Sequence, residues 1–216
     1  MQRGALRAPR GGGGRNRDGA HRQRREELGR CRRRQGAARL GRRGCGGLGI
    51  FVANVSALAQ SMDDESWRRS LEIDVMATVA GIEAAIPLLE QSTAGAIVVI
   101  GTTGAIEIAG PPRPYASAKA ALVPYVKALA RNLAAKNIRA NMVSPGNVYF
   151  KGGVWNILEQ SNPALFQTMV GRNPMGRMGT PTEVANAVVF LASPRAGFIT
   201  GTNLIVDGAL TQRVQF

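Results

Sequence analysis

Short apolar runs alternate along the chain with longer segments in which apolar residues recur every three or four positions. The short runs are rich in Ile and Val and end at turn-forming residues, which predicts strands buried on both faces of a parallel sheet. The longer segments predict amphipathic helices that cover such a sheet. The predicted strands span residues 50–54, 96–100, 138–143 and 203–207, and the predicted helices span residues 61–87, 113–136, 154–170 and 180–191.

Local signals refine three of these helices. Ser61 is followed by acidic residues at positions 63–65, which is typical of a helix start because negative charge there complements the helix dipole. Thr180-Pro-Thr-Glu183 matches a capping box with proline at the first helical position. Pro124 lies inside the second predicted helix, and we expect it to kink that helix.

The regular alternation of strands and helices predicts an α/β fold whose parallel sheet has right-handed crossovers. Ligands bind such sheets at the carboxyl ends of the strands. Asn54, Thr102 and Pro145-Gly146 all follow predicted strands and therefore fall at that edge. Each could be a plain turn residue, but their convergence on one edge favours a binding site.

Tyr115 and Lys119 are four residues apart in the second predicted helix and so share one of its faces. A tyrosine phenol has an ordinary pKa of about 10, and a nearby positive charge lowers it. We expect Lys119 to lower the pKa of Tyr115, so that the phenol exchanges a proton with a substrate oxygen held by Thr102 while a nicotinamide carries the hydride. The pair alone is a weak signal, since a half-buried tyrosine and an exposed lysine on one helix have the same spacing.

The connection between Gly146 and Thr180 is long and holds one predicted helix. Long connections in compact domains are usually lids or binding segments. Trp155, Leu158 and Phe166 make this one apolar. It either covers a substrate or packs against a partner subunit.

The net charge of +14 is unevenly distributed. Residues 1–45 contain 15 Arg and 3 acidic residues, a net charge of +12, whereas residues 46–216 contain 13 basic and 11 acidic residues, a net charge of +2. A strongly basic chain ordinarily suggests nucleic acid or an anionic surface as a partner. Here that argument concerns only the first fifth of the chain.

Residues 1–45 contain no Val, Ile, Phe, Trp or Tyr. They cannot bury enough apolar surface to offset the entropy of ordering, so we expect disorder there and a folded domain from residue 46 to 216. Three interpretations are open. The segment could be an arm that binds nucleic acid without specificity, since it lacks aromatic residues for base stacking. It could also be an organelle transit peptide, or a segment produced by a wrong start or a shifted reading frame. We favour the third and do not expect nucleic-acid binding.

Gly44 to Gly49 spell G-x-G-x-x-G. This motif needs a strand before it and a helix after it, but here an arginine run precedes it and a predicted strand follows, so we reject it. Cys31, Cys45 and His21 show neither a disulfide framework nor metal-ligand spacing, and we predict no disulfide and no metal. No apolar run reaches the length of a membrane span.

Several further motifs follow one another in a definite order. They are Ala53-Asn-Val-Ser56, the helix from Trp67 to Pro87, Gly95 to Thr102, Tyr115-x-x-x-Lys119, Asn141-x-Val-Ser-Pro-Gly146, Pro174-Met-Gly-Arg-Met-Gly179, and Ile199-Thr-Gly201 through Val206-Asp-Gly208. In this order and spacing, residues from about 46 to 216 resemble the C-terminal three-quarters of a short-chain dehydrogenase/reductase.

The resemblance implies a Rossmann-like parallel sheet with flanking helices, NAD or NADP as cofactor, and interconversion of a small-molecule carbonyl and alcohol. It also implies a homodimer or homotetramer. We further expect the protein to be cytoplasmic and to have no membrane as a partner. It makes Tyr115 the general acid/base, with Lys119 lowering its pKa and holding the nicotinamide ribose. The implied catalytic residues are Tyr115, Lys119, Thr102 and Asp74, and the implied cofactor-binding residues are Asn54, Tyr115, Lys119, Pro145, Gly146 and Val148.

Three positions depart from the family pattern. Thr102 stands where the family usually has Ser, and Phe150 stands where it often has a Thr that touches the nicotinamide amide. Asp74 replaces the Asn that holds a proton-relay water, and an ionised carboxylate cannot donate a hydrogen bond.

The family's glycine-rich pyrophosphate turn and the strand that selects NAD or NADP are not found in residues 1–45. We therefore expect the N-terminal part of the fold to be missing, one sheet edge to be exposed and turnover to be impaired. The alternatives are a catalytically inactive, truncated family member and a weak nucleic-acid binder that uses the arginine-rich segment.

Overall fold

The computed structural model describes residues 47–59, 61–108 and 110–214. The expectations for residues 1–45 concern residues outside these ranges. In the described part, all strand pairs are parallel and the strand order is β1-β2-β3-β4. The strands are β1 (Ile50–Ala53), β2 (Gly95–Ile100), β3 (Ile138–Pro145) and β4 (Asn203–Val206). The predicted α/β class with a parallel sheet is thus confirmed, and all four predicted strands form, with ends shifted by one or two residues.

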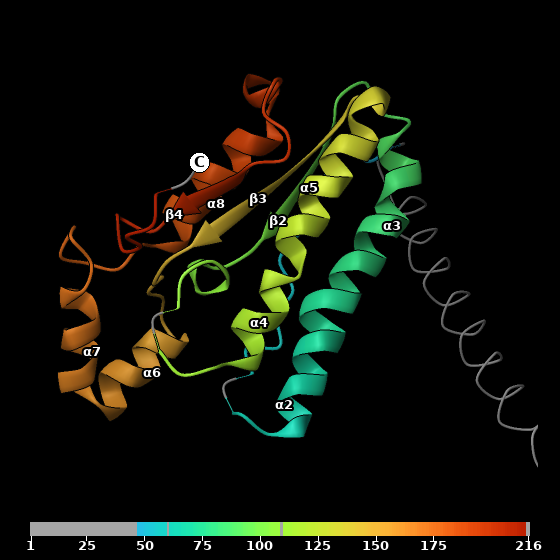
Figure 1. The fold of residues 1–216 in the computed structure, drawn as a ribbon. Helices are drawn as coiled ribbons and strands as arrows, with labels where there is room; N and C mark the ends of the chain where they lie inside the picture. Colours follow the sequence, from blue (N-terminus) through green and yellow to red (C-terminus); the bar gives the residue numbers. More distant parts are fainter. Residues whose placement is uncertain (1–46, 60, 109, 215–216) are drawn as a thin grey trace, which may run out of the picture.

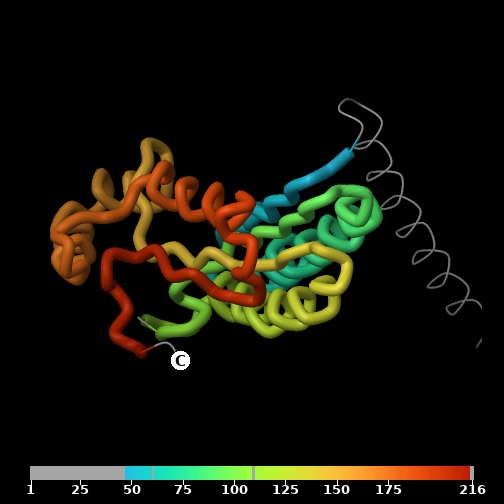
Figure 2. Tube along the Cα trace, turned by 90° about the horizontal axis from the view of Figure 1, so that it is seen from above, coloured from blue at the N-terminus to red at the C-terminus, as the bar shows by residue number. Residues whose placement is uncertain are grey.

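Helices cover both faces of this sheet. Helices α3 (Thr78–Leu89) and α5 (Leu122–Leu133) pack on one face, and α8 (Pro181–Ala192) packs on the other (Figures 1 and 2). Side chains of β2 alternate between the two layers, because Ile97 and Val99 join the core under α3 and α5 while Val98 joins the core under α8. The near-continuous apolar run of β2 reflects this burial on both faces.

Strand β1 is the edge strand among the described residues. Phe51 packs against the core under α3. Its ring lies against Gly81 of α3, where a Cβ on residue 81 would be only 3.0 Å from Phe51 Cζ. Ile50 and Val52 alternate to the other face and remain 49% and 42% exposed. One end of the sheet therefore presents apolar side chains that no described helix covers.

The first predicted helix is continuous but changes its winding. It consists of α2 (Asp64–Arg69), a π-helical segment η1 (Ser70–Ala77) and α3. It begins three residues later than Ser61, because the Asp63 side chain accepts a hydrogen bond from Ser66 N at 2.7 Å and caps the helix. π-Helical turns are rare and often occur at functional sites.

The second predicted helix is interrupted. It consists of α4 (Pro114–Ala120) and α5, separated at Ala121, followed by a short 3₁₀ turn, η3 (Ala134–Lys136). Pro124 has no N–H for the carbonyl of Ala120, and its ring crowds that carbonyl. The expected effect of Pro124 on this helix therefore takes the form of a break at Ala121, one turn before the proline. Further short 3₁₀ turns are η2 (Thr103–Ala105) and η4 (Pro194–Ala196).

The prediction of a single helix over residues 154–170 was wrong. The connection holds two helices, α6 (Val154–Ser161) and α7 (Pro163–Gly171). Pro163 disfavours a helical conformation at the residue before it, and Asn162 has φ −149° and ψ 78° and caps α7 by accepting from Leu165 N at 3.1 Å. Figure 1 shows α6 and α7 together at the end of the molecule toward which β3 and β4 point.

Candidate active site

Four of the predicted site residues lie close together near the carboxyl ends of the strands. Tyr115 and Lys119 come from α4, Thr102 follows β2, and Asp74 comes from η1. Helix α4 packs against both η1 and η2. The Tyr115 phenol interacts with the Thr102 hydroxyl and with the Asp74 carboxylate, so the structure joins residues that are far apart in the sequence.

Lys119 is buried, with 2% of its surface exposed. Its ammonium donates hydrogen bonds to the carbonyl oxygens of Val55 and Ile100, both at 3.0 Å. Val55 follows β1 and Ile100 ends β2, so the side chain ties two strand ends to α4. A buried charge requires such partners, and the alternative of an exposed lysine on a helix surface does not apply.

Asp74 is completely buried beside this ammonium. Its Oδ1 lies 3.6 Å from Lys119 Nζ, and its Oδ2 accepts a long hydrogen bond of 3.4 Å from Ala57 N. Burial lowers the pKa of Lys119, and the Asp74 carboxylate opposes that shift. The sequence pattern did not reveal this direct ion pair, because the partners belong to different helices and are 45 positions apart in the sequence.

The expected direction of the Tyr115 pKa was wrong for this structure. Burial, and then the nearby Asp74 carboxylate, raise the pKa of Tyr115 to about 12, while the hydrogen bond with Thr102 opposes the rise. The charge of Lys119 is directed at two carbonyl groups and at Asp74. The lysine therefore does not dominate the field at the phenol.

The predicted cofactor-binding residues line the same edge of the sheet. Asn54 is exposed directly after β1, and Pro145 ends β3. Gly146 lies against Asp207 at the end of β4. Val148 forms an isolated parallel bridge with Gly179, and Phe150, at the position of the family's Thr, is 49% exposed.

These residues fit the nicotinamide end of a dinucleotide. The amide nitrogen of Asn147, directly after Gly146, is buried and has no hydrogen-bond partner in the described part of the chain. A carboxamide oxygen is a suitable acceptor for such a donor. Ahead of β1, the residues that the structure describes contain no glycine-rich turn between a strand and a helix.

A second polar cluster anchors α6 and was not predicted from the sequence. The Tyr149 phenol donates to the Glu159 carboxylate, and Asn156 Nδ2 donates to the Tyr149 oxygen at 3.0 Å. Asn156 Oδ1 accepts from Gly152 N at 2.9 Å. The hydrogen bond to Glu159 raises the pKa of Tyr149. In the sequence, the only indication of this cluster was that its polar residues lie close together, within residues 149–159.

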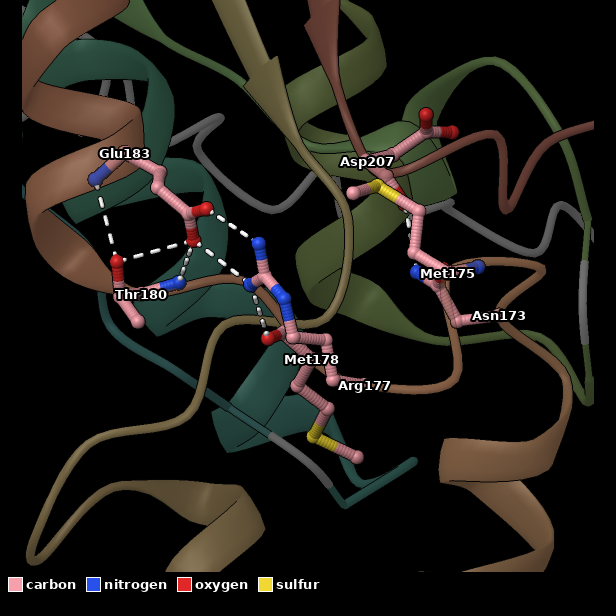
Figure 3. A network of polar contacts seen from close by, with 7 residues as sticks. All are labelled: Asn173, Met175, Arg177, Met178, Thr180, Glu183 and Asp207. Atoms are coloured by element: carbon pink, nitrogen blue, oxygen red, sulfur yellow. Dashed lines mark hydrogen bonds and ion pairs between the residues drawn. The ribbon is translucent and has the colours of Figure 1, made fainter.

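The far end of the α6–α7 connection is fixed by the network in Figure 3. Arg177 forms hydrogen bonds of 2.6 and 3.0 Å with the Glu183 carboxylate, which also accepts from Thr180 N at 2.8 Å. The predicted capping box at Thr180 and Glu183 is therefore confirmed. Asn173 joins the connection to β4, because its Nδ2 donates to Asp207 O at 2.7 Å.

Comparison with known proteins bears on the chemistry of this site. The family model described as enoyl-(acyl carrier protein) reductase matches residues 35–211, and isoepoxydon dehydrogenase of Penicillium expansum is 40% identical over 181 residues, which are 83% of this chain and 68% of that protein. The chain belongs to the short-chain dehydrogenase/reductase family. Members of this family are oxidoreductases that generally use NAD or NADP.

Other members of the family agree in sequence and structure. Dehydrogenase/reductase SDR family member 4 of Oryctolagus cuniculus is 32% identical over 176 residues, covering 78% of this chain and 66% of that protein. The ligand-free aldohexose dehydrogenase of Thermoplasma acidophilum superposes with a TM-score of 0.74 at 29% identity, covering 85% of this chain and 75% of that one. An oxidoreductase of the family from Burkholderia thailandensis gives 0.73 at 32% identity, covering 83% and 69% of the two chains.

The Rossmann-like fold expected from the resemblance is thus confirmed. In the described ranges, no helix is long and apolar enough to cross a membrane.

Proposed function

We propose that this short-chain dehydrogenase/reductase interconverts a carbonyl and an alcohol on a small molecule, with NAD or NADP as cofactor. The observation that carries the proposal is that the Tyr115 phenol forms a hydrogen bond with the Thr102 hydroxyl and lies within the field of Asp74, whose carboxylate is 3.6 Å from Lys119 Nζ. All four residues lie near the carboxyl ends of β1 and β2. A phenol that is hydrogen-bonded to a hydroxyl, with a fixed ammonium one turn along the same helix, suits proton transfer to a substrate oxygen.

In this mechanism the hydride would come from, or go to, the nicotinamide of the cofactor. The Thr102 hydroxyl orients the substrate oxygen toward Tyr115. With a pKa of about 12, the Tyr115 phenol keeps its proton near neutral pH and gives it to the carbonyl oxygen during reduction. Lys119 holds the loops after β1 and β2 in place and would support the nicotinamide ribose, and Asn54, Pro145, Gly146 and Val148 would hold the rest of the nicotinamide end.

The α6–α7 connection is the proposed substrate cover. It presents exposed apolar side chains, including Ile157 at 59% and Leu165 at 44%, which suit either a small apolar substrate or a second subunit. Isoepoxydon is the first compound to assay, since the 40% identical relative is named for it. We further propose a cytoplasmic homodimer or homotetramer and reduced turnover, with a catalytically inactive protein as the alternative.

Titration of the full chain with NADH and with NADPH tests this function. The expected result is binding at nucleotide concentrations below about 1 mM, the usual upper range for enzyme ligands. Binding is detected as quenching of tryptophan fluorescence. Trp155 on α6 is a suitable reporter, and Trp155→Phe identifies its share of the signal. Absence of binding to both nucleotides would contradict the enzyme proposal and support the inactive alternative.

A further inference from the structure

Asp74 belongs to a row of buried polar side chains on one helix. Ser70 and Asp74 are 0% exposed and Thr78 is 2% exposed, and the three are spaced four residues apart. Ser70 Oγ, Asp74 Oδ1 and Thr78 Oγ1 have no hydrogen-bond partner among the described residues. The carboxylate of Asp74 is therefore poorly satisfied by hydrogen bonds, and its main compensation is the ammonium of Lys119 at 3.6 Å.

Lys119 is in the opposite situation. Two carbonyl oxygens at 3.0 Å fix its position, and neither of them cancels its positive charge. Among the described residues, the Asp74 carboxylate raises the pKa of both Lys119 and Tyr115. The other groups that face this cluster are neutral, namely the Thr102 hydroxyl from the loop after β2 and the Ala57 amide from the loop after β1.

We propose that Asp74 is a positioning residue that pairs directly with Lys119 and cancels its charge, and that it thereby keeps the proton on Tyr115. The catalytic part of this inference rests on the proposed function. A neutral asparagine at this position would remove the negative charge that raises the pKa of Tyr115. It would also leave the Lys119 ammonium, one turn further along α4, without its counter-charge, and both changes would favour phenolate. The carboxylate thus adapts the site to giving a proton, as carbonyl reduction requires, rather than to accepting one.

The first test is a spectroscopic titration that needs neither cofactor nor substrate. The ultraviolet absorbance of tyrosinate is followed with rising pH in the wild-type chain and in Asp74→Asn, each with and without Tyr115→Phe, so that the difference reports Tyr115 alone among the three tyrosines. We expect Asp74→Asn to raise the acid dissociation constant of Tyr115 about tenfold, as removal of a nearby negative charge predicts. An unchanged or lowered constant would overturn the proposal.

Ser70→Ala is the matched control, because Ser70 is as buried as Asp74 and lies one turn earlier on the same helix. It removes a polar atom without changing charge and should leave the Tyr115 titration unchanged. An equal shift in Ser70→Ala would show that helix repacking, not charge, moves the phenol, and would also overturn the proposal.

Asp74→Ser guards against failure of the first variant to fold. If circular dichroism shows that both Asp74 variants are unfolded while Ser70→Ala is folded, Asp74 has a purely structural role and the proposal is wrong. Cofactor binding is measured separately on the wild-type chain. Its absence would contradict the proposed function and leave the charge relationship between Asp74 and Tyr115 standing.

Discussion

A Cβ atom added to Gly146 would lie 2.7 Å from the Cβ of Asp207 and 3.0 Å from its Cα. The ends of β3 and β4 approach each other so closely that only glycine fits without movement. We expect Gly146→Ala to lower the free energy of unfolding by about 1–3 kcal/mol, the usual cost of overpacking, and to weaken nucleotide binding because the strand end moves. Urea unfolding and NADH titration measure the two effects.

Gly171→Ala provides the matched control for that substitution. Gly171 ends α7, and no atom lies within 4 Å of a Cβ built there. Alanine should therefore leave stability unchanged or raise it slightly. An equal loss in both variants would mean that the contact with Asp207 is not the cause.

Tyr115→Phe removes the proposed acid/base and keeps the ring. We expect turnover to fall by at least about 10²-fold, the lower range for loss of general acid–base catalysis, with unchanged circular dichroism. Tyr125→Phe is the control, since Tyr125 is partly buried against the α3–α5 core on the neighbouring helix. Undiminished turnover in Tyr115→Phe would refute the assignment of the site.

Lys119→Met leaves the Asp74 carboxylate buried without its counter-charge. Breaking one side of a buried ion pair costs about 3–5 kcal/mol, and we expect a loss of that size in urea unfolding. The double variant Asp74→Asn/Lys119→Met should recover part of the loss, because the unpaired charge is gone. Strictly additive losses would show that the two groups do not interact.

The Arg177–Glu183 interaction should weaken in acid. Hydrogen bonds from Arg177, and then from Thr180, lower the pKa of Glu183 from 4.5 to about 2. A depressed carboxyl pKa contributes stability that is fully present above the unfolded value and is lost as pH falls through the folded value, here between about pH 4.5 and 2.

Thermal unfolding measured across this range tests the expectation. Glu183→Gln should show a smaller dependence of melting temperature on pH than the wild-type chain. Glu65→Gln is the control, since Glu65 lies in the first turn of α2, away from this network. An identical pH dependence in Glu183→Gln and the wild type would contradict the prediction.

The strands could be predicted because burial on both faces imposes continuous apolar runs, such as Ala96 to Ile100, that periodicity alone detects. Helix interruptions were harder. Pro163 marks the break between α6 and α7. The prediction did not use it, because apolar residues recur at helical spacing on both sides of it and suggested one helix. The π-helical winding of Ser70–Ala77 has no signature in the sequence.

The residues that meet at the site could be predicted from the sequence, but the direction of the Tyr115 pKa shift could not. The spacing of Tyr115 and Lys119 indicated that they share a helix face, which is a local property. The sign of the Tyr115 pKa shift depends on burial and on Asp74, which reaches the phenol from another helix. Such an effect is set by tertiary packing and cannot be obtained from spacing along one helix.

The strands are neighbours in the sheet in the same order as they are synthesised. Ile50 pairs with Ala96, Gly95 with Ile138 and Met142 with Asn203, which are 46, 43 and 61 residues apart. Each strand must therefore wait for an entire crossover to leave the ribosome before its next neighbour can join it. The sheet can grow in one direction during translation, and a pause before Asn203 would leave β3 as a temporary open edge.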